Sequence, residues 1–169
     1  EIAEQHLAAV GAVERLSARE LGITAPEAAP RGTVSLPSTK EGSWEHLRAA
    51  VRALINASLS GVQLAALDLG PYRDATAPLY RRASQLGALL PVLIDSTPSS
   101  AVAARPALDR EAAAMRRRLT PYLVTYAQEA HDRGFPLIHP LPMQFPADAE
   151  GARHDDVFML GDEILVAPA

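Results

Sequence analysis

The stretch SWEHLRAAVRALINASLSGVQLAALDLGPY, residues 43–72, decides the fold of this chain because it contains a helix, a turn, a strand and a carboxylate in that order. Ser43 is a favourable N-cap, and apolar residues recur after it at helical spacing as far as Leu59. A nearly continuous apolar run, Val62 to Leu67, follows a glycine and predicts a strand covered on both faces. The stretch therefore predicts one helix-to-strand unit of an α/β fold.

Asp68 stands at the C-terminal end of this predicted strand. In α/β barrels and open α/β sheets the carboxyl ends of the parallel strands form the functional face. Asp68 is therefore the first side chain to consider as a ligand contact. The alternative is an aspartate that only orders the turn at Gly70 and Pro71, and the spacing leaves both roles open.

The rest of the chain predicts further elements of the same kind. Helical periodicity and helix stop signals predict three more helices, at residues 2–21, 78–89 and 108–132. Short apolar runs predict strands at residues 22–25, 33–36, 91–94 and 137–139, and residues 26–31 and 96–106 are expected to be loops. Pro121 is expected to kink the last helix at Thr120. A hairpin is expected to join residues 157–160 to 164–166 around Gly161 and Asp162.

Composition places the chain among globular proteins and excludes several functions. The chain has 169 residues, 48% of them hydrophobic and 21% charged, and a net charge of −4 gives no electrostatic reason to expect nucleic acid or a membrane as partner. No cysteine is present, which excludes a disulfide framework, a thiolate zinc site and a cysteine nucleophile. No cofactor or metal is expected, because four of the histidines show no metal-ligand spacing: His6, His46, His131 and His154. The compartment stays open, with the cytoplasm slightly favoured.

A series of short motifs continues downstream of Tyr72. They are LYRR at 79–82, QLGA at 85–88, LTPYL at 119–123, EA at 129–130, GFP at 134–136, PL at 140–141, FP at 145–146 and FMLGDEILVAP at 158–168. In this order the motifs resemble glycoside hydrolase family 31, the α-glucosidases, α-xylosidases and their relatives. The last motif is the most specific, and the resemblance covers nearly the whole chain.

The resemblance implies the fold class and the domain organisation. The expected fold is α/β, a partial (β/α)8 TIM barrel that contains the C-terminal half, followed by the first hairpin of a β-sandwich domain. A complete barrel needs about 250 residues, so a chain of 169 residues is expected to be a piece of a longer polypeptide. The expected domains are residues 1–142, part of the glycosidase-like barrel, and residues 143–169, the start of the β-domain.

The resemblance also implies where the catalytic groups belong. Glycosidases generally place two carboxylates across the scissile bond, one as nucleophile or base and one as proton donor. In the family the nucleophile lies upstream of anything present here, and the proton donor is the aspartate of a tryptophan-x-glycine-aspartate motif before the helix that begins after Ser43. Aligned without gaps, this motif falls on Leu36-Pro37-Ser38-Thr39, so Thr39 stands at the proton-donor position. A threonine hydroxyl is not a useful proton donor at neutral pH.

Other sugar-binding positions implied by the resemblance are changed as well. The family's arginine at the end of the strand before this loop falls near Ile23, and an arginine and a histidine further along fall on Ile94 and Ser96. The residues that keep the family's type are the candidate substrate-binding residues: Asp68, Tyr72 and Arg31. Asp68 is expected to accept hydrogen bonds from sugar hydroxyls, and the ring of Tyr72 is expected to pack against a sugar.

Three further groups have alternative roles. Glu41 is a substitute proton donor if the loop is re-registered, and otherwise a first-turn acid that stabilises the following helix through its dipole. His139, at the end of a predicted strand, is the best site candidate among the histidines, against a role as a hydrogen-bonded packing residue. The run Arg116-Arg117-Arg118 would suit a phosphate, although such a run on a helix face is normally solvated or paired.

Two functions therefore stay open. The first is part of a glycoside hydrolase family 31-like protein that hydrolyses the O-glycosyl bonds of α-glycosides, with catalysis impaired by Thr39. The second is a non-catalytic carbohydrate-binding or scaffolding module that keeps the barrel shell. A third, unrelated barrel enzyme that uses Asp68 and His139 would lack an assembled nucleophile or metal site. The expected partner is a carbohydrate, and the oligomeric state stays open.

Overall fold

The computed structural model describes residues 34–35, 42–62, 64–94 and 106–168, and every structural statement below concerns this part of the chain. Several predictions lie outside it. They concern the helix at 2–21, the strand at 22–25, the loop at 26–31 and the individual residues His6, Ile23, Arg31, Thr39, Glu41 and Ser96.

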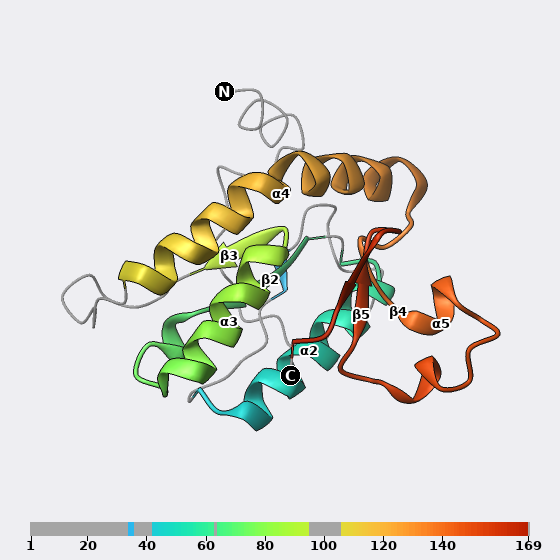
Figure 1. The fold of residues 1–169 in the computed structure, drawn as a ribbon. Helices are drawn as coiled ribbons and strands as arrows, with labels where there is room; N and C mark the ends of the chain where they lie inside the picture. Colours follow the sequence, from blue (N-terminus) through green and yellow to red (C-terminus); the bar gives the residue numbers. More distant parts are fainter. Residues whose placement is uncertain (1–33, 36–41, 63, 95–105, 169) are drawn as a thin grey trace.

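The first sheet is parallel and contains three short strands in the order β1-β2-β3 (Figure 1). They are β1 (Val34–Ser35), β2 (Leu64–Asp68) and β3 (Val92–Ile94). Parallel neighbours need a crossover connection. The chain supplies α2 (Trp44–Leu59) between β1 and β2 and α3 (Ala77–Leu89) between β2 and β3. The predicted alternation of strands and helices is confirmed over this part of the chain.

Helix α2 forms where the sequence predicts it. The side-chain oxygen of Ser43 accepts a hydrogen bond from the backbone N–H of His46 at 3.1 Å, which satisfies one of the free donors of the first turn. One face of the helix is buried, with Leu47, Val51 and Leu54 among its core residues. This face packs against both β2 and β4, so α2 connects the two sheets of the molecule.

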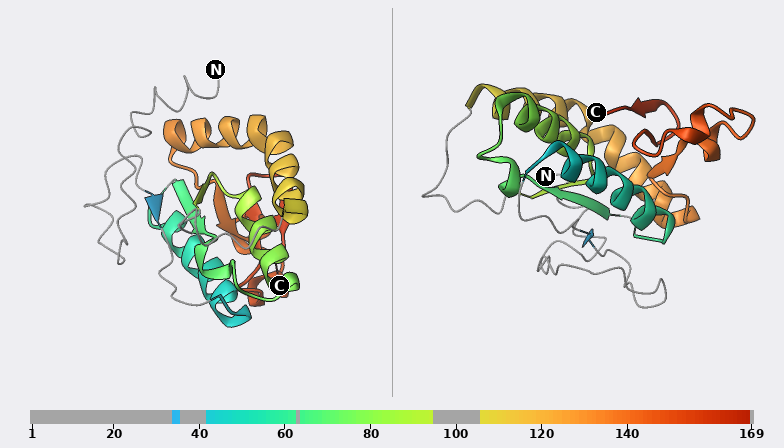
Figure 2. Two further views of the ribbon diagram at one scale, coloured as in Figure 1. Left: turned by 90° about the vertical axis from the view of Figure 1, so that its left-hand side faces the viewer. Right: turned by 90° about the horizontal axis from the view of Figure 1, so that it is seen from below.

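After β2 the chain makes a short 3-10 helix, η3 (Gly70–Tyr72), before α3 begins. The long helix α4 (Pro106–Arg133) packs along α3 and contains Pro121. Figures 1 and 2 show α4 changing direction near its middle, where the yellow part gives way to orange. The bend agrees with the predicted kink, because proline lacks an N–H and its ring crowds the preceding turn. None of the helices in the described ranges is both long and apolar enough to cross a membrane.

The second sheet is antiparallel and contains β4 (Ile138–Pro140), β5 (Phe158–Leu160) and β6 (Ile164–Val166) in that order. The predicted hairpin is confirmed: Leu160 pairs with Ile164 around Gly161, whose φ of 59° suits a glycine. Residues 137–139 were expected to end the barrel, whereas the structure pairs β4 antiparallel with β5. The reason is the return path through α5 (Leu141–Gln144) and η4 (Gly151–Arg153), which brings β5 back beside β4 in the opposite direction.

One hydrophobic core spans both sheets. It contains residues of α2, β2 and α3 together with Leu137, Ile138, Phe158 and Leu160 from the antiparallel part. The core is therefore continuous across the predicted boundary between residues 142 and 143. The division into two domains at that point stays a prediction.

Candidate functional site

Asp68 ends β2 at the carboxyl edge of the parallel sheet. Its Oδ1 atom accepts a hydrogen bond from the backbone N–H of Gly70 at 2.9 Å, and the residue is partly buried. The predicted role in ordering the turn is therefore confirmed. This hydrogen bond also holds the carboxylate at the edge where parallel α/β proteins bind ligands, and a contact with a sugar stays a prediction for this residue.

The neighbouring strand end carries an apolar residue. In the register of β2 and β3, Asp68 is the direct partner of Ile94. Ile94 is a position at which the resemblance implies an arginine. An arginine beside a carboxylate would hold it by a charge-assisted hydrogen bond and would offer further N–H donors to a ligand. Isoleucine supplies neither, and the loss of a polar group next to Asp68 stays a prediction that rests on the resemblance.

Tyr72 does not lie as predicted. Its side chain is 0% exposed and belongs to the hydrophobic core, so no face of its ring is available to pack against a sugar. Its hydroxyl has no hydrogen-bond partner among the described residues, and burial raises the pKa of Tyr72 to about 12. The physical reason for the correction is that η3 turns the chain inward immediately after Asp68.

Gly42 links the loop before α2 to the segment after Asp68. A Cβ atom at Gly42 would lie 2.5 Å from the carbonyl oxygen of Pro71 and 2.8 Å from the Cα atom of Tyr72, closer than any real side chain allows. Only glycine permits this approach of two backbones. Gly42 directly follows Glu41 and is three residues beyond Thr39. Gly42 is therefore in close contact with the segment that follows Asp68.

A polar cluster supports the connection between β2 and α3. Both oxygens of Asp109, at the start of α4, accept hydrogen bonds from the guanidinium of Arg73 at 3.2 Å, and Oδ1 also accepts one from the Tyr80 hydroxyl at 2.5 Å. The guanidinium lies 5.1 Å from the centroid of the Tyr80 ring. Burial, followed by the hydrogen bond to Asp109, raises the pKa of Tyr80 to about 12. Sequence reasoning missed this cluster, because no local spacing relates residues on a loop, α3 and α4.

His139 has the packing role that was one of its two predicted roles. The residue is fully buried in β4, where Met159 is its register partner. Its Nδ1 atom lies 3.2 Å from the carbonyl oxygen of Pro136, and the edge of its ring meets Phe135 at a centroid distance of 5.0 Å. It belongs to the antiparallel sheet, whereas Asp68 belongs to the parallel one. The structure does not bring the two residues together.

Arg116 also has a structural role. Its guanidinium donates hydrogen bonds to the carbonyl oxygens of Leu90 and Pro91, each at 2.6 Å, and to that of Gly87 at 3.3 Å. These carbonyls belong to the last turn of α3 and the residues after it, and burial lowers the pKa of Arg116. Arg117 and Arg118 are exposed. The prediction that the run is paired or solvated is confirmed.

No metal centre forms within the described ranges. In these ranges no three histidine, aspartate or glutamate side chains lie close enough together to hold one ion. The polar groups that the described part of the site offers a ligand are the Asp68 carboxylate and backbone groups.

The parallel sheet with its crossover helices and the antiparallel sheet after it define part of a barrel-type α/β protein. Residues 38–126 match the glycosyl hydrolases family 31 TIM-barrel domain, and residues 134–169 match the glycosyl hydrolase family 31 C-terminal domain. The chain belongs to glycosyl hydrolase family 31, which confirms the resemblance seen in the motifs. The partial α/β barrel and the following antiparallel strands agree with the predicted fold class.

Relatives and solved structures place the chain within longer proteins. It is 32% identical over 148 residues to a probable alpha-glucosidase of Oryza sativa subsp. japonica, a match that covers 82% of this chain and 16% of the relative. It is 33% identical over 135 residues to the lysosomal alpha-glucosidase of Mus musculus, covering 75% of this chain and 14% of the relative. The structure superimposes with a TM-score of 0.66 and 28% identity on a Flavobacterium johnsoniae GH31 dextranase complexed with glucose, covering 75% of this chain and 17% of the dextranase. The chain thus spans less than a fifth of each of these proteins.

Proposed function

We propose that this chain forms part of a family 31 protein that binds α-glycosides and hydrolyses them much more slowly than an intact member of the family. The observation that carries the proposal is the hydroxyl of Thr39 at the position where the family places its proton-donating aspartate. Family membership and the α-glucosidase and dextranase names of the similar proteins support an α-glycoside as the ligand.

The expected defect follows from the chemistry of the leaving group. Breaking a glycosidic bond expels an alkoxide unless an acid protonates it, and a threonine hydroxyl is far too weak an acid to do so. General acid catalysis contributes about 10²–10⁴ to the rate, so we expect a loss of about a thousandfold or more. The isoleucine beside Asp68 supports a weakened sugar site as well, because an apolar group there cannot bind a hydroxyl.

The leaving group itself provides the test. Turnover of each substrate is measured for the full-length protein and for an intact family member. Relative to that member, turnover of 2,4-dinitrophenyl α-glucoside, whose leaving group needs no proton, should be reduced far less than turnover of methyl α-glucoside. Thr39→Asp alone should not restore the rate on methyl α-glucoside while Ile23, Ile94 and Ser96 remain. Equal and rapid turnover of both substrates would contradict the proposal.

Glu41 offers the matched control for this experiment. If methyl α-glucoside is hydrolysed rapidly and Glu41→Gln abolishes that rate, the proton donor is Glu41 and the loop has been re-registered. If Glu41→Gln changes only stability, Glu41 acts as an acid just before α2. The predicted place in the first turn is wrong, because α2 begins at Trp44 after the Ser43 cap and its first-turn acid is Glu45. A negative charge near this end of the helix still favours its positive pole.

The second candidate function is a non-catalytic carbohydrate-binding or scaffolding module. The resemblance predicts substitutions at the proton donor and at three sugar-binding positions together. Four linked substitutions favour a module without activity more than the loss of one residue would. It would bind α-glucosides in a calorimetric titration and would leave even the dinitrophenyl substrate intact. Presence of the family's nucleophile motif upstream of this chain would favour the slow enzyme instead.

A further inference from the structure

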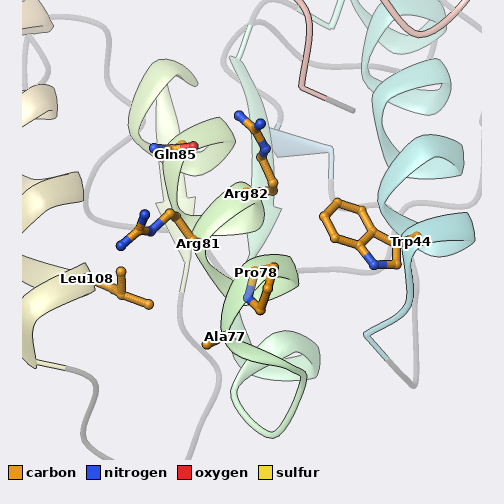
Figure 3. Close-up of a pocket in the computed structure, with 7 residues that line it drawn as sticks. All are labelled: Trp44, Ala77, Pro78, Arg81, Arg82, Gln85 and Leu108. Atoms are coloured by element: carbon orange, nitrogen blue, oxygen red, sulfur yellow. The ribbon is translucent and has the colours of Figure 1, made fainter.

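We infer a second ligand site, for a carboxylate-bearing sugar, in a pocket on the outer helical wall of the molecule. The pocket has a volume of about 770 Å³ and lies where α2, α3 and α4 begin (Figure 3). Its size falls within the range of about 300–1,000 Å³ that small-molecule sites occupy. Asp68 and the connection that follows it do not line this pocket, so it is separate from the candidate site described above.

Two guanidinium groups give the pocket its preference for an anion. Arg81 and Arg82 are consecutive and exposed on α3, and Figure 3 shows Arg82 extending toward the top of the view, away from Trp44, while Arg81 extends toward Leu108. Among the described residues neither arginine makes an ion pair, whereas Arg48 and Arg52 on α2 both pair with aspartates. An arginine fork matches a carboxylate by two parallel hydrogen bonds.

An aromatic ring also lines the pocket. Trp44 is 48% exposed although it is the largest apolar side chain of the chain, and Figure 3 shows its indole on the side of α3 that carries Arg82, with Arg81 on the side of Leu108. A half-exposed indole offers a flat apolar surface, which suits the apolar face of a sugar ring. Pro78 and Leu108 add apolar surface, and Gln85 adds a polar group that also donates to Glu111 at 3.4 Å.

The combination defines the ligand by its chemistry. We infer a carboxylate on the ligand from the two arginines alone. We infer that the ring packed on Trp44 is a sugar from the proposed function. A disaccharide with one uronate residue satisfies both conditions, because its ring can cover the indole while its carboxylate reaches Arg82. An acidic peptide would satisfy only the first condition, and it therefore becomes an outcome of the test.

The test is calorimetric titration of the full-length protein with a glucuronate-containing disaccharide, its neutral glucose counterpart and a peptide of equal charge. We expect the acidic sugar to bind at least about tenfold more tightly than the neutral one, and Arg82→Gln to remove that preference. Trp44→Ala should weaken binding of the acidic sugar, and Trp44→Phe should restore part of it, which separates loss of the ring from loss of the fold.

Two controls make the experiment decisive. Arg117→Gln removes the same charge from an exposed position outside the pocket and should leave binding unchanged. Asp68→Asn should also leave binding of the acidic sugar to the pocket unchanged. Binding to the pocket can therefore be observed even if the proposed α-glucoside site at Asp68 binds nothing. Equal affinity for acidic and neutral sugars, an equal loss with Arg117→Gln, or binding of the peptide alone would overturn the inference.

Discussion

The hairpin region of this protein is joined to α4 by side-chain hydrogen bonds, whereas the site region is the part in which the resemblance predicts changed residues. In the hairpin region Glu163, within the most specific motif, accepts hydrogen bonds from Tyr126 at 2.6 Å and Tyr122 at 2.8 Å on α4. The Tyr122 hydroxyl also lies 2.6 Å from the carbonyl oxygen of Leu160, so its single hydrogen is shared between these two acceptors. In the site region β3 places Ile94 opposite Asp68, and the resemblance predicts that the family has an arginine at that position and an aspartate at the position of Thr39.

The difference shows what a family resemblance measures in this chain. The contacts between α4 and the hairpin join two packed layers, so we expect changes in them to cost stability. A residue that contacts only a ligand is expected to cost binding or activity instead. The motifs of this chain predict its architecture, and its activity stays a prediction. The predictions below separate the two regions by what each substitution damages.

The largest effect on stability is expected in the hairpin region, from Gly161→Val. The φ of 59° at Gly161 is unfavourable for a β-branched residue, and a Cβ atom there would collide with the hydroxyl of Tyr122 and lie 2.8 Å from the Tyr126 ring. We expect the free energy of unfolding to fall by about 3 kcal/mol, measured by denaturant titration. A stability within the error of the wild type would show that the hairpin is not tightly packed on α4.

Arg116→Gln should have the next largest effect. It removes a charged donor from three carbonyl oxygens at the end of α3 and should lower the free energy of unfolding by about 2 kcal/mol. Arg117→Gln on the same helix is the matched control and should change it by less than about 0.5 kcal/mol. Similar losses from both variants would point to the net charge of α4 rather than to these hydrogen bonds.

Asp68→Ala tests the site region. Loss of one turn hydrogen bond should lower the free energy of unfolding by only about 1 kcal/mol. If Asp68 also binds a sugar, calorimetric titration with glucose or xylose should show affinity weakened by about 1–3 kcal/mol. A lower stability with no measurable heat for any sugar, even in the wild type, would leave Asp68 with its turn role alone.

The smallest effect is the pH dependence contributed by Glu163. Hydrogen bonds from Tyr126 and then Tyr122 lower the pKa of Glu163 below its ordinary value of 4.5. A carboxylate whose pKa is lower in the folded state stabilises the fold above pH 4.5, and this contribution disappears as the pH falls through the lowered pKa. Thermal melts between pH 7 and pH 3 should therefore show a smaller acid-induced drop for Glu163→Gln than for the wild type. Asp162→Asn, which neutralises the adjacent carboxylate, is the control for the change in net charge.

The sequence by itself determined the local elements and the family. The Ser43 cap, the apolar run that ends at Asp68 and the glycine of the hairpin each act through residues only a few positions away, so their signals are readable in one dimension. The motifs identified the family, because they belong to these local elements and occur in the family's order. The placement of Thr39 at the proton-donor position rests on that order too, and it stays a prediction because Thr39 lies outside the described residues.

Only the tertiary structure decided which residues meet. Asp68 and Ile94 are 26 positions apart in sequence and lie side by side because β2 and β3 pair in that register. The burial of Tyr72 and the pairing of β4 with β5 likewise depend on how η3 and the return loop direct the chain, which no periodicity records. The arginines and the indole of the outer pocket come from α3 and α2, and their approach depends on helix packing. Long-range contacts of this kind arise from the mutual burial of whole elements, so they exist only once the core has formed.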